Sequence, residues 1–205
     1  MERKKKGFLK KARNVMLLVA ACLLMLGGLP KGFTENVQAA EVKLDNRTAI
    51  QTVIEKEFNG PDKKYRELWN AAMKELSKEL TEEQYQEYLK SPTNLNLLAY
   101  TEKTYAPYFT EKGYDVFTYT GDAFMASMYP GDFNLKVSNI KIKQNMKRTK
   151  SYNFTFEVTY TNPHKQSSVF NYRGKASLLQ PGKISVIEFT DLNGLEDELN
   201  KLNKK

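Results

Sequence analysis

One stretch of the chain alternates strictly between apolar and polar side chains. Residues 152–160 read Tyr-Asn-Phe-Thr-Phe-Glu-Val-Thr-Tyr. Because successive side chains of a strand point to opposite faces of a sheet, this stretch has one apolar face and one polar face. The pattern is typical of an antiparallel strand that is covered on one face and exposed to water on the other. Other elements of the chain must therefore cover the apolar face.

Further strands are predicted around this stretch from β-branched and aromatic residues and from the turns between them. They cover residues 114–120, 133–142, 170–178 and 184–189. Within 133–142 the apolar positions change phase between Val137 and Ile140, which indicates a bulge or bend. The polar segment after Gly194 is expected to form a short helix.

The residues before these strands have helical periodicity. Residues 50–58 place apolar side chains on one face, with Glu57 as a charged exception. A second helix over 65–80 carries an unbroken apolar stripe. The sequence Thr81-Glu82-Glu83-Gln84 has the spacing of a capping box and predicts that a third helix starts there. A short helix is expected around 95–100.

Helices that come first, followed by strands joined through hairpins, indicate an α+β fold rather than alternating βαβ units. We therefore expect N-terminal helices packed on a curved antiparallel β-sheet. The alternating strand at 152–160 would turn its aromatic face toward those helices.

The first forty residues have the three parts of a secretory signal peptide. Seven basic residues lie within 3–13, and an uncharged run follows over 15–29. This run is shorter than the ~20 residues that a membrane-spanning helix needs. We expect 1–40 to be a signal peptide cleaved near Ala40, and 41–205 to form a single domain outside the membrane of a Gram-positive-type bacterium.

Two alternatives for the leader stay open. The first is an uncleaved membrane anchor. The second is lipidation at Cys22, because Val19-Ala20-Ala21-Cys22 resembles a lipobox. The apolar run continues past Cys22 through residues 23–26, whereas a lipidated cysteine usually ends such a run. This observation argues against lipidation. Contact with the membrane is expected only through such an uncleaved or lipidated leader.

Most of the net positive charge lies in the leader. The whole chain has a formal charge of +8, whereas residues 41–205 carry 24 Lys or Arg and 22 Asp or Glu. Nucleic-acid-binding domains usually keep a concentrated basic face, so no nucleic-acid partner is expected. A basic stretch remains at 136–150. It is interpreted either as solvated lysines of strand edges and turns or as a contact for a polyanion.

Few residues in the mature chain are suited to catalysis or metal binding. The only cysteine, Cys22, lies in the leader, which leaves no disulfide and no thiol. The only histidine, His164, lies in a predicted turn, where a general base would lack a partner and a pocket. We therefore expect an exposed His164, no metal, no cofactor and no catalytic residue that the sequence identifies.

The order of these elements resembles the nuclear-transport-factor-2-like superfamily, which has a cystatin-like cone fold. The chain is similar to exported single-domain members from Bacillus and its relatives. The stretches that carry the resemblance are 53–61, 137–142, 152–160 and 182–187. The resemblance covers about 42–199 and implies a cone-shaped sheet wrapped around a helix, with a pocket at the wide end.

Relatives in that superfamily differ in function, and fold alone does not assign one. Ketosteroid isomerases and dehydratases place an Asp with a Tyr or His in the pocket, whereas others bind small molecules or act as dimerising and assembly modules. The enzyme pattern has no identifiable match in this chain. The resemblance therefore transfers no catalytic residue.

Aromatic residues are dense between 100 and 129, and they are interpreted as pocket lining, as an interface or as ordinary core. Glu188 lies among apolar residues, where burial raises a carboxyl pKa, unless it faces solvent from an edge strand. The resemblance places the helix that carries Trp69 at the border of the pocket. The candidate pocket residues are Trp69, Tyr105, Tyr108, Phe117, Tyr119 and Glu188.

These observations favour an exported, non-catalytic binding or assembly module of the cell envelope. Its partner would be an envelope component, a peptide or a protein, and a homodimer is a further option. The alternatives are a small-molecule-binding protein and an isomerase-like or hydratase-like enzyme that uses the cone pocket. An interior filled with aromatic side chains favours the first hypothesis, and an open cavity with an inward carboxylate favours the others.

The leader makes a direct prediction. We expect the secreted protein to begin at Ala40 or Glu41, because small residues follow the interrupted apolar run. Intact-mass measurement of the protein in culture supernatant checks this. A membrane-retained species that keeps residues 1–39, or a diacylglyceryl adduct on Cys22, would contradict it.

Overall fold

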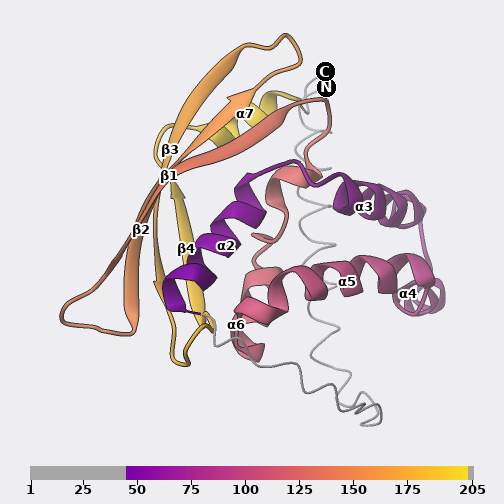
Figure 1. Ribbon diagram of the computed structural model, residues 1–205. Helices are drawn as coiled ribbons and strands as arrows, with labels where there is room; N and C mark the ends of the chain where they lie inside the picture. Colours follow the sequence, from indigo (N-terminus) through magenta and orange to yellow (C-terminus); the bar gives the residue numbers. More distant parts are fainter. Residues whose placement is uncertain (1–44, 203–205) are drawn as a thin grey trace.

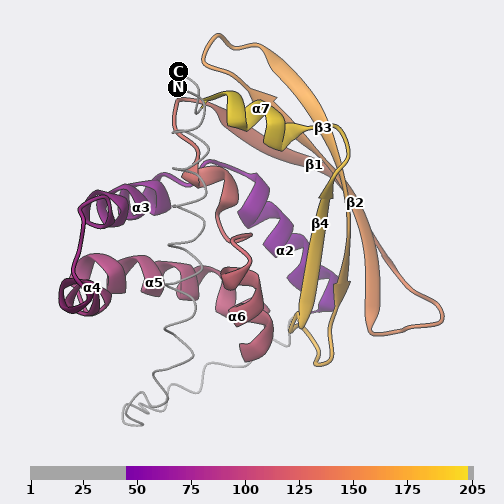
Figure 2. The ribbon, with the colours of Figure 1, turned by 180° about the vertical axis from the view of Figure 1, so that it is seen from behind.

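The computed structural model describes residues 45–202, so the predicted leader lies outside the described residues. Four antiparallel strands form one sheet in the order β1-β2-β3-β4. The strands are β1 (Asn134–Gln144), β2 (Ser151–Thr161), β3 (Ser167–Ser177) and β4 (Val186–Asp191). The sheet is curved, and the helices α2 to α6 lie on one side of it (Figures 1 and 2). The predicted α+β class is confirmed.

The alternating strand has the predicted orientation. In β2 the even-numbered residues are buried, and Asn153 and Thr155 on the other face are exposed. The buried residues are Tyr152, Phe154, Phe156, Val158 and Tyr160. We call the side of the sheet that carries Asn153 and Thr155 the outer face.

The phase change in the preceding strand is also confirmed. The pairing of β1 with β2 shifts between Ser138 and Lys141. Asn139, within the shift, has a φ of 54°, in the left-handed region that asparagine tolerates better than most residues. The extra residue forms a bulge, and the strand bends there.

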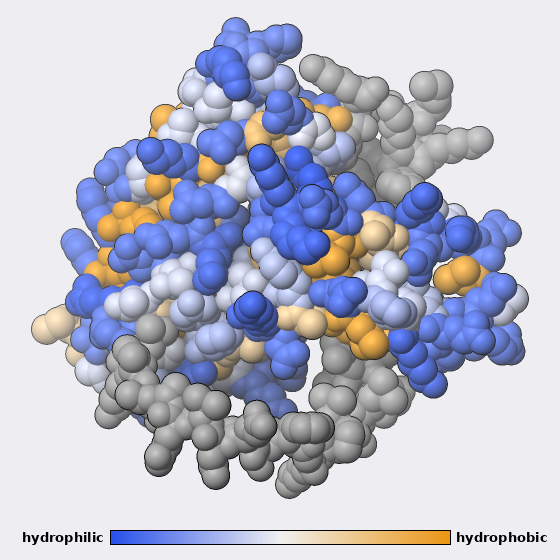
Figure 3. All heavy atoms as spheres, turned by 45° about the vertical axis from the view of Figure 1, so that its right-hand side comes forward, coloured by the Kyte–Doolittle hydropathy of each residue, from blue (hydrophilic) through white to orange (hydrophobic). Residues whose placement is uncertain are grey.

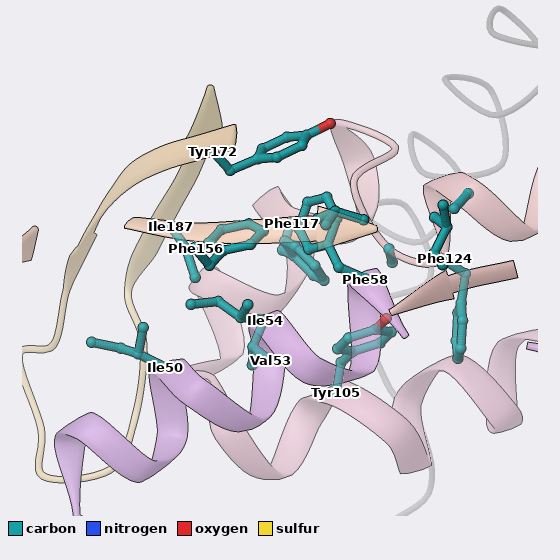
Figure 4. Close-up of a cluster of buried hydrophobic side chains, with 14 of the residues drawn as sticks. Ile50, Val53, Ile54, Phe58, Tyr105, Phe117, Phe124, Phe156, Tyr172 and Ile187 are labelled. Atoms are coloured by element: carbon teal, nitrogen blue, oxygen red, sulfur yellow. The ribbon is translucent and has the colours of Figure 1, made fainter. Parts of the chain in front are cut away.

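The first described helix, α2 (Asn46–Phe58), covers the apolar face of the sheet. Its N-cap, Asp45, accepts hydrogen bonds from the backbone N–H groups of Arg47 and Thr48. At its C-terminal end, the ring of Phe58 lies 4.8 Å from the rings of both Phe156 and Tyr172. In Figure 4 the apolar side chains of α2 point toward the strands. The space between helix and sheet is filled by these side chains.

Three helices form a layer farther from the sheet: α3 (Lys63–Leu76), α4 (Glu82–Leu89) and α5 (Pro92–Tyr105) (Figure 1). The predicted capping box is present at the start of α4, between Thr81 and Gln84. The helix expected around 95–100 is longer than predicted. Its N-cap is Ser91, whose side chain accepts a hydrogen bond from the Asn94 N–H. Pro92 is the first helical residue, a position that proline tolerates well.

The prediction of a strand at 114–120 is wrong, because this segment belongs to the helix α6 (Glu111–Tyr119). Thr110 caps the helix by accepting a hydrogen bond from the Gly113 N–H. Gly113 and Phe117, one helical turn apart, are buried. β-Branched and aromatic content is therefore a weaker signal here than the cap and the spacing of the buried positions.

The C-terminal end agrees with the predicted short helix. The helix α7 (Leu195–Leu202) buries Leu195 and Leu199 and carries three acidic residues in its first turn, where they interact favourably with the helix dipole. The last strand starts at Val186 rather than at 184. Two short 3₁₀ helices, η1 (Ala106–Tyr108) and η2 (Met125–Met128), complete the described elements.

The orientation of β2 predicts unequal costs of truncation. Phe154→Ala and Phe156→Ala should each lower the free energy of unfolding by ~3–5 kcal/mol, because both rings are buried. Thr155→Ala, on the exposed face between them, should cost far less. Urea unfolding monitored by circular dichroism measures all three variants, and the reverse ordering would contradict the helix-over-sheet packing.

Candidate functional site

A buried carboxylate lies at the centre of the helical side of the fold. Glu57 of α2 is 3% exposed and accepts three hydrogen bonds from the protein. The Tyr105 hydroxyl donates to Oε2 at 2.8 Å, and the backbone N–H groups of Phe124 and Met125 donate to Oε2 and Oε1 at 2.7 Å each. Phe124 has a φ of 56° and directly precedes η2. The backbone turns at this left-handed residue, and the turn points the N–H groups of Phe124 and Met125 toward the Glu57 carboxylate.

Burial and hydrogen bonding act in opposite directions on Glu57. The pKa of Glu57 is raised from 4.5 to about 8: burial raises it most, the three hydrogen-bond donors lower it, and the charge of Asp122 raises it. The pKa of Tyr105 is raised by burial and then by the negative charge of Glu57. The carboxyl group therefore has unusual acid–base properties, although it is almost completely buried.

The geometry of Glu57 indicates a structural role. Both carboxyl oxygens accept hydrogen bonds from the protein itself, and the donors belong to α5 and to the N-terminal end of η2. A general acid or base needs access to a proton of its substrate. We conclude that Glu57 joins α2 to the 122–125 turn. The sequence contained a signal for it, since Glu57 is the charged exception in the apolar stripe of its helix.

A surface groove runs between α6 and β4. It has a volume of about 270 Å³. At one end of the groove, α6 lies directly against the backbone just before β4, since a Cβ on Gly113 would lie 2.4 Å from the Ile184 carbonyl oxygen. Its lining residues are Gly113, Val116, Phe117, Thr120, Asp122 and Val186 to Phe189.

Two carboxyl groups and two exposed valines give the groove its chemistry. Asp122 is partly buried, and burial raises its pKa although the Thr120 hydroxyl donates to it at 2.7 Å. Glu188 is exposed. Val116 and Val186 are 47% and 46% exposed, so both present apolar surface to solvent. The groove thus combines negative charge with apolar walls.

The open edge of the sheet forms one wall of this groove. β4 pairs with β3 on one side, and on the other side no strand of the described chain adjoins it. Just before β4, Phe109 forms a parallel bridge with Ile184, in which the Ile184 N–H donates to the Tyr108 carbonyl and the Thr110 N–H donates to the Ile184 carbonyl. The chain then turns into α6. The backbone just before β4 therefore already pairs with an extended segment at Ile184. From Val186 onward, the same edge has no strand partner in the described chain.

The structure brings two of the predicted pocket residues together. Phe117 and Glu188 both line the α6–β4 groove, and Tyr119 lies on α6 with 42% exposure. Glu188 faces solvent from the edge strand, which was the alternative interpretation of its position.

The other three predicted pocket residues lie elsewhere. Trp69 stacks on Tyr65 within α3, with ring centroids 6.1 Å apart. Tyr105 is buried against Glu57, and Tyr108 lies in η1 beneath the Lys56 ammonium. These three aromatic side chains therefore contribute to packing. For Tyr105 and Tyr108, this agrees with the interpretation of the aromatic segment 100–129 as ordinary core.

The remaining predicted features are consistent with the structure. His164 lies exposed in the turn between β2 and β3. Glu157 lies on the polar face of β2, where it accepts a hydrogen bond from the Asn139 side chain at 2.7 Å. It borders a second open hollow of about 440 Å³ beside the β1 bulge.

The described residues show no cluster of three or more His, Cys, Asp or Glu side chains that could hold a metal ion. Within the same range, no helix is long and apolar enough to cross a membrane. On the face in Figure 3 hydrophilic residues predominate, and hydrophobic atoms are visible only in separated areas. Comparison with protein families, with characterised proteins and with solved structures finds no match to this chain.

The raised pKa of Glu57 predicts a pH-dependent stability. Between about 4.5 and about 8, the folded protein holds a proton on Glu57 that the unfolded chain has released, so the free energy of unfolding should fall as the pH rises. Glu57→Gln cannot titrate and should remove this part of the dependence. Asp122, whose pKa is also raised by burial, is present in both proteins.

Urea unfolding of the wild type and the variant at several pH values between 4 and 9 measures this difference. Glu67→Gln, on the exposed face of α3, is the matched control and should keep the slope of the wild type. Equal slopes for the wild type and Glu57→Gln would contradict the assignment.

Proposed function

We propose that this chain is an exported, non-catalytic binding module of the bacterial cell envelope, and that it binds an extended peptide segment of an envelope protein along β4. The observation that carries the proposal is the open edge of β4 beside the α6–β4 groove. An extended peptide can join such an edge through backbone hydrogen bonds, while side-chain pockets supply specificity.

The groove indicates which peptides would bind. A strand added to β4 would turn alternate side chains toward α6, where the exposed surface of Val116 favours apolar residues. Asp122 and Glu188 favour Lys or Arg at a neighbouring position. The expected ligand is therefore an extended segment that combines apolar and basic residues.

The filled interior supports a non-catalytic function. The pocket implied by the nuclear-transport-factor-2-like resemblance would lie between the sheet and its helix, where Phe58 packs 4.8 Å from Phe156 and Tyr172 and 5.2 Å from Phe189. Glu57 is bonded to internal donors. In the proposal, the chain is a member of that superfamily of the binding or assembly type.

One observation favours the alternative of a small-molecule-binding protein or an isomerase-like enzyme. Asp122, with its raised pKa, lies in the same groove as Phe117, so an inward carboxyl and an aromatic ring are present together. Small-molecule sites usually enclose most of their ligand, and this groove is open along one side. The peptide proposal accounts for the open edge as well.

Export is the second part of the proposal. It depends on the signal-peptide pattern of residues 1–40 and on the small-residue motif near Ala40. In this setting the ligand would be met outside the membrane. A second copy of the chain that pairs through the same β4 edge would make the module a homodimer, which sedimentation at several concentrations detects.

A single groove substitution tests peptide binding. Random peptides displayed on phage are selected on the protein, and an enriched peptide is synthesised and titrated by fluorescence anisotropy. Val116→Glu should weaken its binding about tenfold, because a charge must then be desolvated at an apolar contact. Val169→Glu is the matched control: Val169, on β3, is 51% exposed and lies outside the groove, so binding should not change.

Two outcomes would contradict the proposal. One is selection without any enriched peptide, and the other is an enriched peptide that binds both variants equally well. Enrichment of peptides that lack both apolar and basic residues would retain the site and overturn the predicted specificity.

A further inference from the structure

Basic side chains gather at one end of the outer face of the sheet. In the strand register, Lys143 lies opposite Asn153, which lies opposite Lys175. Lys141 and Arg173 flank Thr155 in the same way. All four basic residues are exposed, and because they share columns with the outward residues of β2, they project from the same face. Residues separated by about thirty positions in the sequence thus form one basic surface.

The two hairpin turns at this end extend the basic surface. The β1–β2 turn carries Lys147, Arg148 and Lys150, all exposed, and the β3–β4 turn carries the half-exposed Lys183, whose ammonium donates to the Pro107 carbonyl at 2.7 Å. No acidic residue occurs between Asp132 and Glu157 in the sequence. Across the described chain, the ion pairs are those of Lys64 and Lys201, so none of these basic groups forms one, and Glu188, opposite Lys175 on β4, is the acidic neighbour at the margin of this surface. We call the basic residues of the two turns, together with Lys141, Lys143, Arg173 and Lys175, the basic end.

Apolar side chains protrude from the same two turns. Met146, in the β1–β2 turn, is 93% exposed, and Leu179, in the β3–β4 turn, is 63% exposed. The Leu178 N–H donates to the Lys150 carbonyl at 2.9 Å, which fixes the two turns next to each other. In Figure 1 both turns lie at the lower end of the sheet. Exposed apolar residues among cations are typical of surfaces that enter the headgroup region of a bilayer.

The described chain also begins at this end. The side chain of Asn46 accepts from the Gly182 N–H at 2.7 Å and donates to the Tyr152 hydroxyl at 3.1 Å. The neighbouring Arg47 donates to the Ile142 carbonyl. Asp45, the first described residue, therefore lies beside the basic end, and the predicted signal peptide precedes it in the sequence. The domain and the membrane would meet here during export.

We propose that the basic end, with Met146 and Leu179 at its tips, contacts the surface of an anionic lipid bilayer. The positive charges complement anionic headgroups, and the two apolar side chains enter the interface between them. This inference goes beyond the peptide groove. The groove lies along the free edge of β4, and the basic end lies on the outer face of β1 to β3 and in the hairpin turns. The inference assigns a second surface to the domain, orients the domain with its hairpin turns toward the membrane, and departs from the expectation that only the leader contacts a membrane.

Two other polyanions are less well matched to this surface. Single-stranded nucleic acids bind through aromatic platforms, and the outward positions of β2 in this region are Asn153 and Thr155. A soluble polyphosphate needs the charges but gains nothing from Met146 and Leu179. The exposed apolar tips therefore favour the lipid surface.

A fluorescent label at the tip tests the contact in the full chain. Cys22 is replaced by Ala, Met146 is replaced by Cys, and the new cysteine carries the polarity-sensitive fluorophore NBD. The label should shift to shorter wavelength on vesicles of phosphatidylglycerol and phosphatidylcholine, and not on phosphatidylcholine alone. The same label on Val169→Cys, at an exposed position of β3 away from the basic end, should not shift. This local signal separates contact at the tip from binding through the leader.

Charge removal tests the electrostatic part. Replacement of Lys147, Arg148 and Lys150 by Gln in the Met146-labelled chain should raise the lipid concentration for the half-maximal shift on the order of 100-fold, about fivefold for each charge. Replacement of Lys74, Lys78 and Lys90 by Gln changes the net charge equally in the distant helical layer and should change this concentration little. Val116→Glu, in the peptide groove, should have no effect on the shift, so the two proposals fail independently.

Several results would overturn the inference. These are vesicle binding without a shift at position 146, equal shifts at 146 and 169, or equal losses from the two triple variants. Tight binding of inorganic polyphosphate with no shift on vesicles would replace the bilayer by a soluble polyanion as the ligand of the basic end.

Discussion

The packing of Phe58 against the rings of Phe156 and Tyr172 joins the C-terminal end of α2 to the middle of the sheet. The register of the strands places these two rings opposite each other on neighbouring strands, 5.1 Å apart and nearly parallel. Their common surface fixes how α2 crosses the strands. Glu57, the residue before Phe58, is thereby held against the helical layer, where it binds the Phe124 and Met125 amides. Phe124 in turn stacks on Tyr65 of α3, with ring centroids 4.2 Å apart, and contacts Tyr105 of α5. The position of the layer formed by α3 to α5 thus depends on the packing of Phe58 against the sheet, through Glu57 and then Phe124.

The features that the sequence predicted are those that depend on near neighbours in the chain. The alternation in β2, the capping box at Thr81 and the phase change before Ile140 each need only a few consecutive residues. The helix α6 was missed because its composition favours a strand, while its cap at Thr110 and the close approach of Gly113 to Ile184 become meaningful only with the fold. The candidate site shows the same limit. Phe117 and Glu188 were named from their surroundings, whereas Asp122 and the open edge of β4 depend on which strand ends the sheet.

Charge provides a second example. Residues 136–150 are recognisable as basic in the sequence, but Arg173 and Lys175 join them only through the pairing of β3 with β2. A net charge near +2 for residues 41–205 therefore conceals a strongly uneven distribution. On the two proposals together, β4 would begin near the membrane at Val186 and lead away from it, so that a peptide in the groove would be held along a line that rises from the bilayer surface.

The bonds between Glu57 and the Phe124 and Met125 amides also link parts of the chain that are 67 and 68 positions apart. These amides can exchange their hydrogens with solvent only when the carboxyl group withdraws from them, and this requires α2 to leave the sheet or the turn to open. The helix, the turn and the sheet beneath them therefore belong to one cooperative unit. The helix α4 lies farther from these bonds and can open without disturbing them. Sequence change is accordingly better tolerated at the exposed positions of α4 than at any position that touches the buried carboxyl group.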